Sequence, residues 1–385
     1  LRWGSSRLPY TQYPLDPVMV GDRHLTEAAQ IINSAKSPLL ILGPMSTPND
    51  EAIIRLADRM QWPIHCDVLH PLRYVKRQGL VWDDFLLISE ERRTQFKPDV
   101  VLHLGGQLLS KRIQQWLEES APEHYIHVHE SVRRIDPGHL MTLRLFCSPQ
   151  YFADALLEKI KPRPFQASPW DSDAIQSRLD KFLFSKNELS EPAIARCLSS
   201  LLPDQHALFI GNSMPIRDLQ MFAQRGASPK RIDGNRGASG IDGLIATAAG
   251  FFAGLQKPGT LLIGDLAFLH DLNSLHQLSR LTQPVIIVLI NNHGGGIFSM
   301  LPISRYESLM PFFATPHALT FLDAARLFGL AYEKPQTINE FISGYQSALR
   351  RNSHCLIEIT SEQERNAQIH RQCEQFLIRL GDDSR

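Results

Sequence analysis

The sequence predicts an α/β protein of two domains, each a parallel sheet flanked by helices. Two observations lead to this prediction: apolar runs of strand length alternate with helical stretches, and a proline-containing segment interrupts the alternation once. A chain of 385 residues also exceeds what one compact core usually holds. We therefore assign residues 1–17 to a linker, 18–160 to a Rossmann-like central domain, 161–189 to a second linker and 190–385 to a C-terminal domain.

Apolar runs that end in turn residues predict the strands of the central domain. Residues 37–44 and 98–106 both end in a turn that contains glycine, and residues 124–129 form a third run. In the C-terminal domain we predict strands at 207–211, 260–263, 284–290 and 355–359, and helices at 241–255, 271–281 and 319–328.

Composition excludes several classes of partner. Lys plus Arg and Asp plus Glu are both 40, so a net charge of zero gives no electrostatic reason to bind nucleic acid or an anionic membrane. No apolar run approaches the roughly 20 residues that span a bilayer. The five cysteines form no C-x-x-C pair, which indicates free thiols in a reducing compartment. We expect a cytoplasmic protein.

The chain opens on Leu1 instead of Met, and residues 1–17 show neither helical nor strand periodicity. They also lack the continuous apolar stretch of a signal peptide. We expect a fragment or a processed product in which this linker once followed another segment.

Two strand ends carry the residues with the clearest chemistry. Asp265 follows one predicted strand, and Asn292 follows the next. Carboxyl ends of parallel strands meet at one edge of a sheet, which is where such sheets bind ligands. A carboxylate, an amide oxygen and the Gly294 carbonyl are hard oxygen ligands that suit Mg²⁺, or Mn²⁺, together with a diphosphate. The glycine run 294–296 would let the backbone approach phosphate closely.

Two alternatives are open for these features. Asp265 is also a plausible cap for the helix that follows it, and Asn291-Asn292 is also a plausible ordinary turn. A dinucleotide is the other candidate ligand, because glycines at 43, 105 and 106 follow strands of the central domain. Neither glycine turn extends to G-x-G-x-x-G, which disfavours that interpretation.

The spacing of the two strand ends resembles the thiamine-diphosphate signature, G-D-G followed after about 25 residues by N-N, with Leu266 in place of the last glycine. Three further stretches narrow the resemblance: GNSMPIRD at 211–218, GNRGASGIDG at 234–243 and NNHGGGIFSMLP at 291–302. Together they resemble the 2-succinyl-5-enolpyruvyl-6-hydroxy-3-cyclohexene-1-carboxylate synthases of menaquinone biosynthesis, a family that has Leu after Gly-Asp.

The resemblance implies a transferase that uses thiamine diphosphate and Mg²⁺. In that family 2-oxoglutarate is decarboxylated and the succinyl carbanion adds to isochorismate. It also implies a homo-oligomer, a dimer or a dimer of dimers. Two alternatives are another thiamine-diphosphate 2-oxo-acid decarboxylase or synthase, and a non-catalytic module that binds cofactor or only associates.

The resemblance also assigns residues. Arg217, Arg236 and the pair Lys111-Arg112 match positions that face substrate carboxylates, which the guanidinium fork grips well. A solvated helix start is the alternative for Lys111-Arg112, and a surface salt bridge is the alternative for Arg217. The positions that match cofactor contacts are Ser213, Met214, Ile241, Gly264, Asp265, Leu266, Asn292, Gly294, Gly295, Ile297 and Phe298, with Asp265, Asn292 and Gly294 as metal ligands.

Two expectations remain. Ile241 matches the bulky residue that supports the bent cofactor, although simple core packing is the alternative. The family's activating glutamate lies in an N-terminal pyrimidine-binding domain, so we expect this chain to lack that residue, to fold, and to be inactive alone. His127 and His129 share one strand face, but no Cys or carboxylate completes a metal site, so we interpret them as structural.

Overall fold

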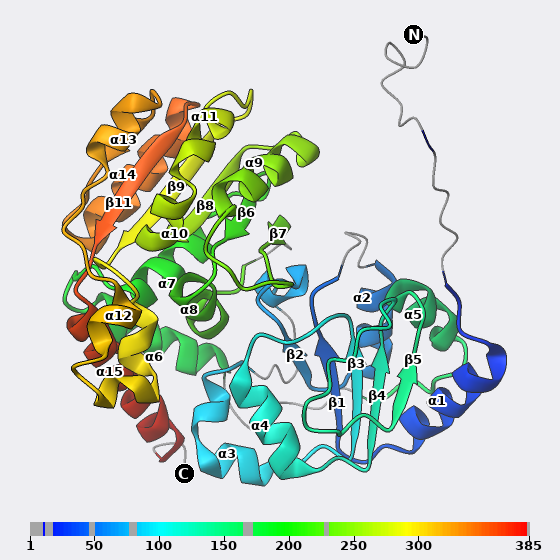
Figure 1. Ribbon diagram of the computed structural model, residues 1–385. Helices are drawn as coiled ribbons and strands as arrows, with labels where there is room; N and C mark the ends of the chain where they lie inside the picture. The colour runs from blue at the N-terminus through cyan, green and yellow to red at the C-terminus, as the bar shows by residue number, and fades with distance from the viewer. Residues whose placement is uncertain are drawn as a thin grey trace.

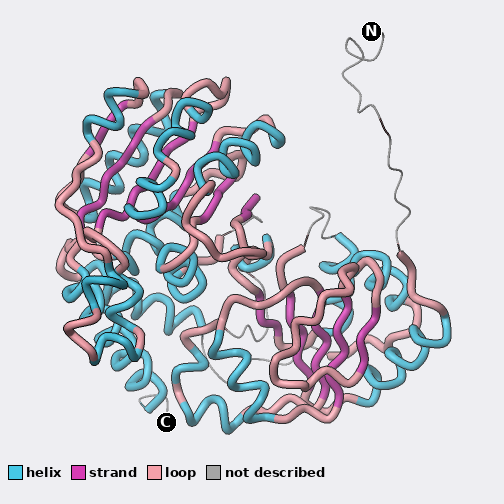
Figure 2. The backbone as a smooth tube through the Cα atoms, viewed as in Figure 1, coloured by secondary structure: helices cyan, strands magenta, loops and turns pink. Residues whose placement is uncertain are grey.

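Two parallel β-sheets organise the chain (Figures 1 and 2). The computed structural model describes residue 11 and residues 18–45, 51–76, 83–164, 172–226 and 231–382. Helices flank both sheets, so the predicted fold class is confirmed. The predicted linker 1–17 lies outside the described residues except for Thr11, and the domain limits remain predictions.

The first sheet has five strands in the order β2-β1-β3-β4-β5, a doubly wound arrangement whose direction of winding changes between β1 and β3. Its elements are α1 (Asp22–Ser34), β1 (Pro38–Leu42), α2 (Glu51–Met60), β2 (Ile64–Cys66), the 3₁₀ turns η1 (Pro71–Tyr74) and η2 (Leu86–Ile88), α3 (Glu90–Gln95), β3 (Val100–Leu104), α4 (Lys111–Ser120), β4 (His124–Val128), β5 (Leu143–Leu145) and α5 (Pro149–Leu157).

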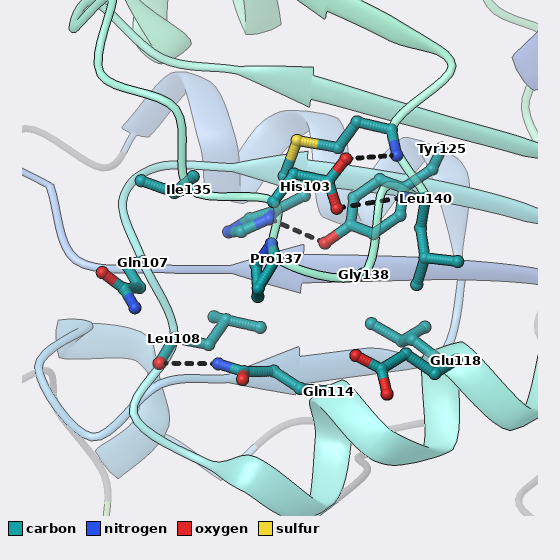
Figure 3. Close-up of a pocket in the computed structure, with 13 residues that line it drawn as sticks. His103, Gln107, Leu108, Gln114, Glu118, Tyr125, Ile135, Pro137, Gly138 and Leu140 are labelled. Carbon is teal, nitrogen blue, oxygen red and sulfur yellow. Dashed lines mark hydrogen bonds between the residues drawn. The ribbon is translucent and has the colours of Figure 1, made fainter.

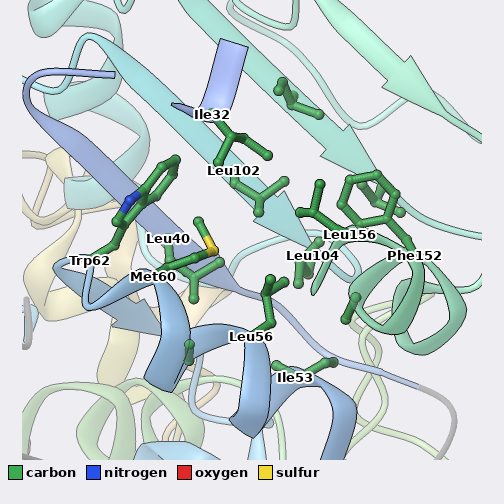
Figure 4. Close-up of a cluster of buried hydrophobic side chains, with 14 of the residues drawn as sticks. Ile32, Leu40, Ile53, Leu56, Met60, Trp62, Leu102, Leu104, Phe152 and Leu156 are labelled. Atoms are coloured by element: carbon green, nitrogen blue, oxygen red, sulfur yellow. The ribbon is translucent and has the colours of Figure 1, made fainter. Parts of the chain in front are cut away.

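Burial explains why these segments form strands and helices. Every residue of β1 and β3 is buried, as expected for central parallel strands that helices cover on both faces. Helix α2 turns one apolar stripe inward, so Leu56 meets Leu40 and Leu104 in the core cluster of Figure 4. Ser110 caps the N-terminus of helix α4, because its hydroxyl accepts from the Ile113 amide at 3.3 Å.

The second sheet has six strands in the order β10-β11-β9-β8-β6-β7. Its strands are β6 (Ala207–Ile210), β7 (Arg231–Asp233), β8 (Gly259–Gly264), β9 (Val285–Asn291), β10 (Ala331–Glu333) and β11 (Cys355–Thr360). The helices are α6 (Ser172–Phe184), α7 (Glu191–Leu201), α8 (Met214–Phe222), α9 (Leu244–Leu255), α10 (Asp265–His270), α11 (Leu275–Leu278), α12 (Met310–Ala314), α13 (Leu322–Leu327), α14 (Ile338–Arg351) and α15 (Gln363–Asp382), with 3₁₀ turns η3 (Leu272–Ser274), η4 (Gly296–Met300) and η5 (Pro302–Arg305).

Some predicted elements differ from the structure. The helix predicted over 241–255 begins at Leu244, because Gly243 adopts a left-handed φ of 69°. The helix predicted over 271–281 is a 3₁₀ turn followed by the single turn α11. Part of the predicted linker 161–189 forms α6, which buries Leu179 and Leu183 against both halves of the molecule. A shared core, which spacing along the sequence does not reveal, stabilises this helix.

Polar contacts also join the two halves. Gln220 on α8 accepts from the Val68 amide at 2.6 Å and donates to Asp84 at 3.0 Å. The carboxylate of Asp83 lies between two buried guanidinium groups, at 3.3 Å from Arg73 and paired with Arg225. Burial alone would raise the pKa of Asp83, but the attraction of Arg225 and Arg73 lowers it overall.

No helix in the described ranges is both long enough and apolar enough to cross a lipid bilayer.

We predict that Asp83→Asn lowers the free energy of unfolding by about 3–5 kcal/mol, because it leaves two buried guanidinium charges without their counterion. Denaturant titration would measure the change. The control Asp323→Asn removes a carboxylate that is 93% exposed and should change stability by less than about 0.5 kcal/mol. The pKa of Asp83 is lowered in the folded protein, so its carboxylate contributes fully to the free energy of unfolding near neutral pH. This contribution should decline as the pH falls below about 4. Equal midpoints for both variants would contradict the prediction.

Candidate functional site

The site is centred on the carboxyl ends of β8 and β9. These strands pair in parallel, with Gly264 opposite Ile290, so the residues that follow them emerge at the same edge of the sheet. The Asp265 carboxylate closes the gap between the two loops. Its Oδ2 accepts from the Gly294 amide at 2.9 Å, and its Oδ1 accepts from the Leu266 amide at 2.6 Å.

Asp265 is a buried carboxylate with an unusual environment. Its exposed fraction is 2%, and His317 Nε2 lies 3.2 Å from its Oδ2. Burial raises the pKa of Asp265, while the amides of Gly294 and Leu266 and the neighbouring imidazole of His317 oppose that rise. Asp265 is the first residue of α10, whose N-cap position is Gly264 and which has no side-chain cap hydrogen bond, so the capping alternative for Asp265 is not what the structure shows.

The two consecutive asparagines do different things. Asn291 donates to Glu358 Oε1 at 2.7 Å and to the Leu319 carbonyl at 3.0 Å, so its side chain holds β9 to its neighbours. Asn292 donates through Nδ2 to Glu191 Oε1 at 2.9 Å. Its Oδ1 is buried without a hydrogen-bond partner among the described residues, so its lone pairs are available to a cation.

Glu191 is a site residue that the sequence analysis missed. It lies at the start of α7, 101 residues before Asn292, and has an exposed fraction of 3%. Burial, followed by the negative charge of Asp218, raises the pKa of Glu191 to about 7. No motif marked it, because its partner is distant in sequence and a Ser-Glu pair at a helix start is typical of ordinary capping.

The glycine run serves the packing of the loop itself. Gly294 has a φ of +142°, and a Cβ there would lie 2.4 Å from the Ala314 carbonyl oxygen. A Cβ on Gly295 would lie 2.8 Å from the Phe298 ring. A side chain at Gly294 or Gly295 would therefore collide with the loop itself. Gly264 differs, since a Cβ there would meet nothing within 4 Å.

Arg217 and Arg236 lie near one another beside the start of α8. Arg217 Nη1 donates to the Ser213 carbonyl at 2.6 Å, and Arg236 Nη1 donates to Asn212 Oδ1 at 2.8 Å. Burial lowers the pKa of both groups, and the charge of Arg236 lowers that of Arg217 further. Ser213 itself has a φ of 70°, an unusual conformation for a residue with a side chain.

These guanidinium groups have room for a ligand. Their hydrogen bonds run to neutral oxygens, and among the ion pairs of the described residues neither Arg217 nor Arg236 has a carboxylate partner. The surface salt bridge considered for Arg217 is therefore not seen in those ranges.

A large cavity collects several of the predicted residues. Its volume is about 640 Å³, and Lys111, Arg112, Met214, Arg217 and Ile297 all line it. A neighbouring cavity of about 360 Å³ shares Lys111, Arg112 and Arg217 with it. Three cationic groups from two helices, α4 and α8, thus face the same space, which suits a ligand with several negative charges.

The walls of the large cavity also contain residues that the sequence analysis did not single out. Arg305 and Arg371 add two cations, and Glu374 on α15 forms an ion pair with Arg112. Lys111 and Arg112 do begin α4, as the helix-start alternative states, yet both also face the cavity.

The remaining predicted cofactor residues lie outside the lining of the large cavity. Ile241 packs, partly buried, against the core of the second sheet, as its core-packing alternative anticipates. The ring of Phe298 lies 5.5 Å from that of Phe313. Ser213, Leu266, Asn292 and Gly295 are likewise not among the residues that line the cavity.

The central domain offers a poor site for a dinucleotide. At the winding reversal between β1 and β3 the two loops close on each other: the Gly106 amide donates to the Pro44 carbonyl at 2.8 Å, and a Cβ on Gly43 would lie 2.4 Å from the Gly106 oxygen. A cavity of only about 40 Å³ lies nearby, and His103 beside it bonds Tyr125 and Gly106 (Figure 3).

His127 and His129 of the central domain form hydrogen bonds with backbone groups. His127 Nε2 lies 2.9 Å from the Gly105 oxygen, and His129 Nδ1 accepts from the Ser131 amide at 2.9 Å. Within the described ranges no three His, Cys, Asp or Glu side chains converge as metal ligands, so an ion near Asp265 would depend on amide and carbonyl oxygens as well.

The chain folds into a doubly wound sheet followed by a second parallel sheet. The carboxyl edge of the second sheet carries a carboxylate and an amide oxygen that has no partner among the described residues. This combination is typical of cofactor-binding α/β proteins. Family models make the class specific. Residues 1–210, more than half of the chain, match the model described as the middle domain of thiamine pyrophosphate. Residues 219–359 match the thiamine pyrophosphate enzyme C-terminal, TPP-binding domain. The chain therefore belongs to the thiamine pyrophosphate enzyme family.

Curated relatives are similar over nearly the whole chain. A Chlorobaculum parvum protein named 2-succinyl-5-enolpyruvyl-6-hydroxy-3-cyclohexene-1-carboxylate synthase is 39% identical over 96% of this chain. A Rubrobacter xylanophilus protein of the same name is 38% identical over 94% of it. This chain spans 64% of the length of each of these two relatives.

Solved structures share the fold. Benzoylformate decarboxylase from Polynucleobacter necessarius superposes with a TM-score of 0.67 at 17% identity, covering 93% of this chain and 67% of the other.

Gly294 and Gly264, two glycines at the candidate site, provide a matched test. Gly294→Ala should lower the free energy of unfolding by about 1–3 kcal/mol, because alanine is strained at a φ of +142° and meets the Ala314 carbonyl. Gly264→Ala should keep the unfolding midpoint of the parent protein, because its φ is −83° and the space beside it is open. Urea titration of both variants checks this, and a Gly294→Ala midpoint equal to that of Gly264→Ala would refute it.

Proposed function

We propose that the protein is a 2-succinyl-5-enolpyruvyl-6-hydroxy-3-cyclohexene-1-carboxylate synthase, a transferase of menaquinone biosynthesis. It decarboxylates 2-oxoglutarate and adds the succinyl carbanion to isochorismate. The observation that carries this proposal is the large cavity in which Lys111, Arg112 and Arg217 face Ile297, close in sequence to the metal-ligand candidates. The names of the curated relatives support the choice of product.

The donor set fits thiamine diphosphate with Mg²⁺, or with Mn²⁺. Asp265 would supply a carboxylate, Asn292 its unpaired Oδ1, and Gly294 a carbonyl oxygen that accepts one bond, from the Gly296 amide at 3.0 Å, and keeps a second lone pair. The open space beside Gly264 suits the diphosphate. When bound, the cofactor supplies the electron sink for a decarboxylation.

The chain's own residues handle the charge of the substrates. Both proposed substrates carry carboxylates, and the guanidinium groups of Arg217 and Arg236 have donors to offer them. Lys111 and Arg112 face the large cavity together with Arg217, and Glu374 pairs with Arg112. Arg236 is not among the residues that line this cavity. Met214 and Ile297 give the cavity apolar surface, which strengthens the ionic contacts by excluding water.

The proposal includes a homo-oligomer, either a dimer or a dimer of dimers, in the cytoplasm. The segment after Ile297 exposes large apolar side chains, which are typical of surfaces that another chain covers: Leu301, Tyr306, Leu309, Phe312 and Phe313. All five cysteines are free and buried, which fits a reducing compartment.

The test is to supply the purified full-length gene product with isochorismate, 2-oxoglutarate, thiamine diphosphate and Mg²⁺. We expect CO₂ and the six-membered-ring product to form in step. A panel of other 2-oxo acids distinguishes the alternative decarboxylase, which would release CO₂ from one of them without isochorismate. Cofactor binding without turnover of any 2-oxo acid would indicate the non-catalytic module instead.

We predict that Asp265→Ala abolishes Mg²⁺-dependent binding of thiamine diphosphate, because the loss of a charged ligand leaves the diphosphate uncompensated. Calorimetric titration of cofactor with and without Mg²⁺ measures this. Asp323→Ala, at an exposed carboxylate on α13, is the control and should bind like the parent protein. If Asp265→Ala keeps the Mg²⁺-dependent affinity for thiamine diphosphate of the parent protein, the assignment of Asp265 as a metal ligand is wrong.

We predict that Arg217→Ala and Arg236→Ala impair the handling of substrate and leave the binding of cofactor unchanged. The loss of a charge-assisted pair costs about 1.5–3 kcal/mol, so turnover should fall roughly 10–100-fold while thiamine-diphosphate affinity is kept. Steady-state kinetics and cofactor titration on the same preparations separate the two effects. Arg326→Ala, at a guanidinium that is 70% exposed, should change neither. Cofactor affinity that drops in step with turnover would contradict the assignment.

A further inference from the structure

The first turn of α7 places a buried carboxylate, that of Glu191, against the Asn292 side chain. Glu191 follows the capping residue Ser190, whose hydroxyl accepts from the Ala193 amide at 3.3 Å, so its backbone is fixed. Its side chain points into the protein, with 3% of its surface exposed. Its Oε1 accepts from Asn292 Nδ2 at 2.9 Å and from the Ser361 hydroxyl at 3.1 Å.

This contact decides which end of the Asn292 amide faces the site. The oxygen and nitrogen ends of an amide have nearly the same shape, and only the oxygen can ligate a cation. Glu191 Oε1 is a hydrogen-bond acceptor, so it must face the NH₂ end of the Asn292 amide. Asn292 Oδ1 therefore points away from Glu191, and it is buried without a partner among the described residues. Gly296 leaves room for this orientation, since a Cβ there would lie 2.6 Å from Asn292 Nδ2.

Stability alone does not account for a carboxylate at this position. Burying such a group is costly unless its oxygens are satisfied. The second oxygen, Oε2, is buried and makes no hydrogen bond among the described residues. An apolar side chain of similar volume would fill the same space without that penalty. The contact with Asn292 therefore offers a reason for Glu191 that lies in the site and not in the fold.

We propose that Glu191 is a positioning residue, which fixes the Asn292 amide so that Oδ1 is presented to the metal ion of the cofactor. The inference rests on the proposed cofactor site, because Asn292 matters only if a cation binds there. Partners that orient metal ligands in this way typically contribute 10–100-fold to metal affinity.

The first experiment replaces Glu191 with Met, which removes the acceptor and keeps most of the volume. We expect the Mg²⁺ concentration for half-maximal thiamine-diphosphate binding to rise roughly 10–100-fold in the full-length gene product. The unfolding midpoint without metal or cofactor should stay the same or rise, because a buried carboxylate is gone. Glu188→Gln is the control: it neutralises a carboxylate three residues earlier, which pairs with Arg365 and not with Asn292, and should leave the Mg²⁺ dependence unchanged.

The second experiment reverses the pair. Asn292→Asp alone sets two carboxylates against each other and should weaken Mg²⁺-dependent binding. Adding Glu191→Gln restores one donor and one acceptor with their direction exchanged, because the new glutamine amide would donate to a carboxylate whose other oxygen faces the ion. We expect the double variant to regain most of the affinity that Asn292→Asp loses. A merely structural role for Glu191 predicts no such rescue.

The outcomes separate this inference from the proposed function. If Asp265→Asn abolishes Mg²⁺ dependence while Glu191→Met leaves it unchanged, the positioning role is wrong and the cofactor site stands. If neither variant changes Mg²⁺ dependence, both are wrong. If Glu191→Met lowers the metal-free unfolding midpoint together with Mg²⁺ affinity, and the double variant shows no rescue, Glu191 is structural and the inference is overturned.

Discussion

The parallel pairing of β8 with β9 is the constraint on which the candidate site depends. Register places Gly264 opposite Ile290, so Asp265 and the loop after Asn291 leave the sheet side by side. Both strands are buried along nearly their whole length, and a shift by one residue would turn each side chain to the other face of the sheet, which disfavours such a shift. A shift would also carry Asn292 away from Asp265. In this register the Gly294 amide donates to Asp265.

The cationic cavity depends on a second constraint, the contact between the two halves of the chain. Arg217 stands on α8, and Lys111 and Arg112 stand on α4, which belongs to the other sheet. Gln220, one turn after Arg217, bonds both Val68 and Asp84 of the central domain. A helix held this way keeps its arginine at a fixed position relative to α4. The packing between the halves, and not either half alone, therefore creates a space that is lined by cations from both.

Some departures from ordinary packing lie at the site. Ser213 and Gly294 have positive φ values, and the buried atoms Asn292 Oδ1 and Glu191 Oε2 lack hydrogen-bond partners among the described residues. Backbone strain and unsatisfied buried groups cost stability, so proteins keep them mainly where function requires them. Those at the carboxyl edge of the second sheet agree with a site that is completed by a charged ligand.

The sequence by itself determined the α/β class, the principal buried strands and the positions of Asp265 and Asn292. Each of these depends on a local signal: an apolar run of strand length, or a polar residue directly after it. The tertiary structure decided the rest. Helix α6 lies in a segment that we had assigned to a linker, because its apolar residues are buried against both halves. The different roles of Asn291 and Asn292, and the contact with Glu191, likewise come from partners 67 and 101 residues away. Contacts at such separations leave no periodic pattern in the sequence, so only the folded chain reveals which side chains meet.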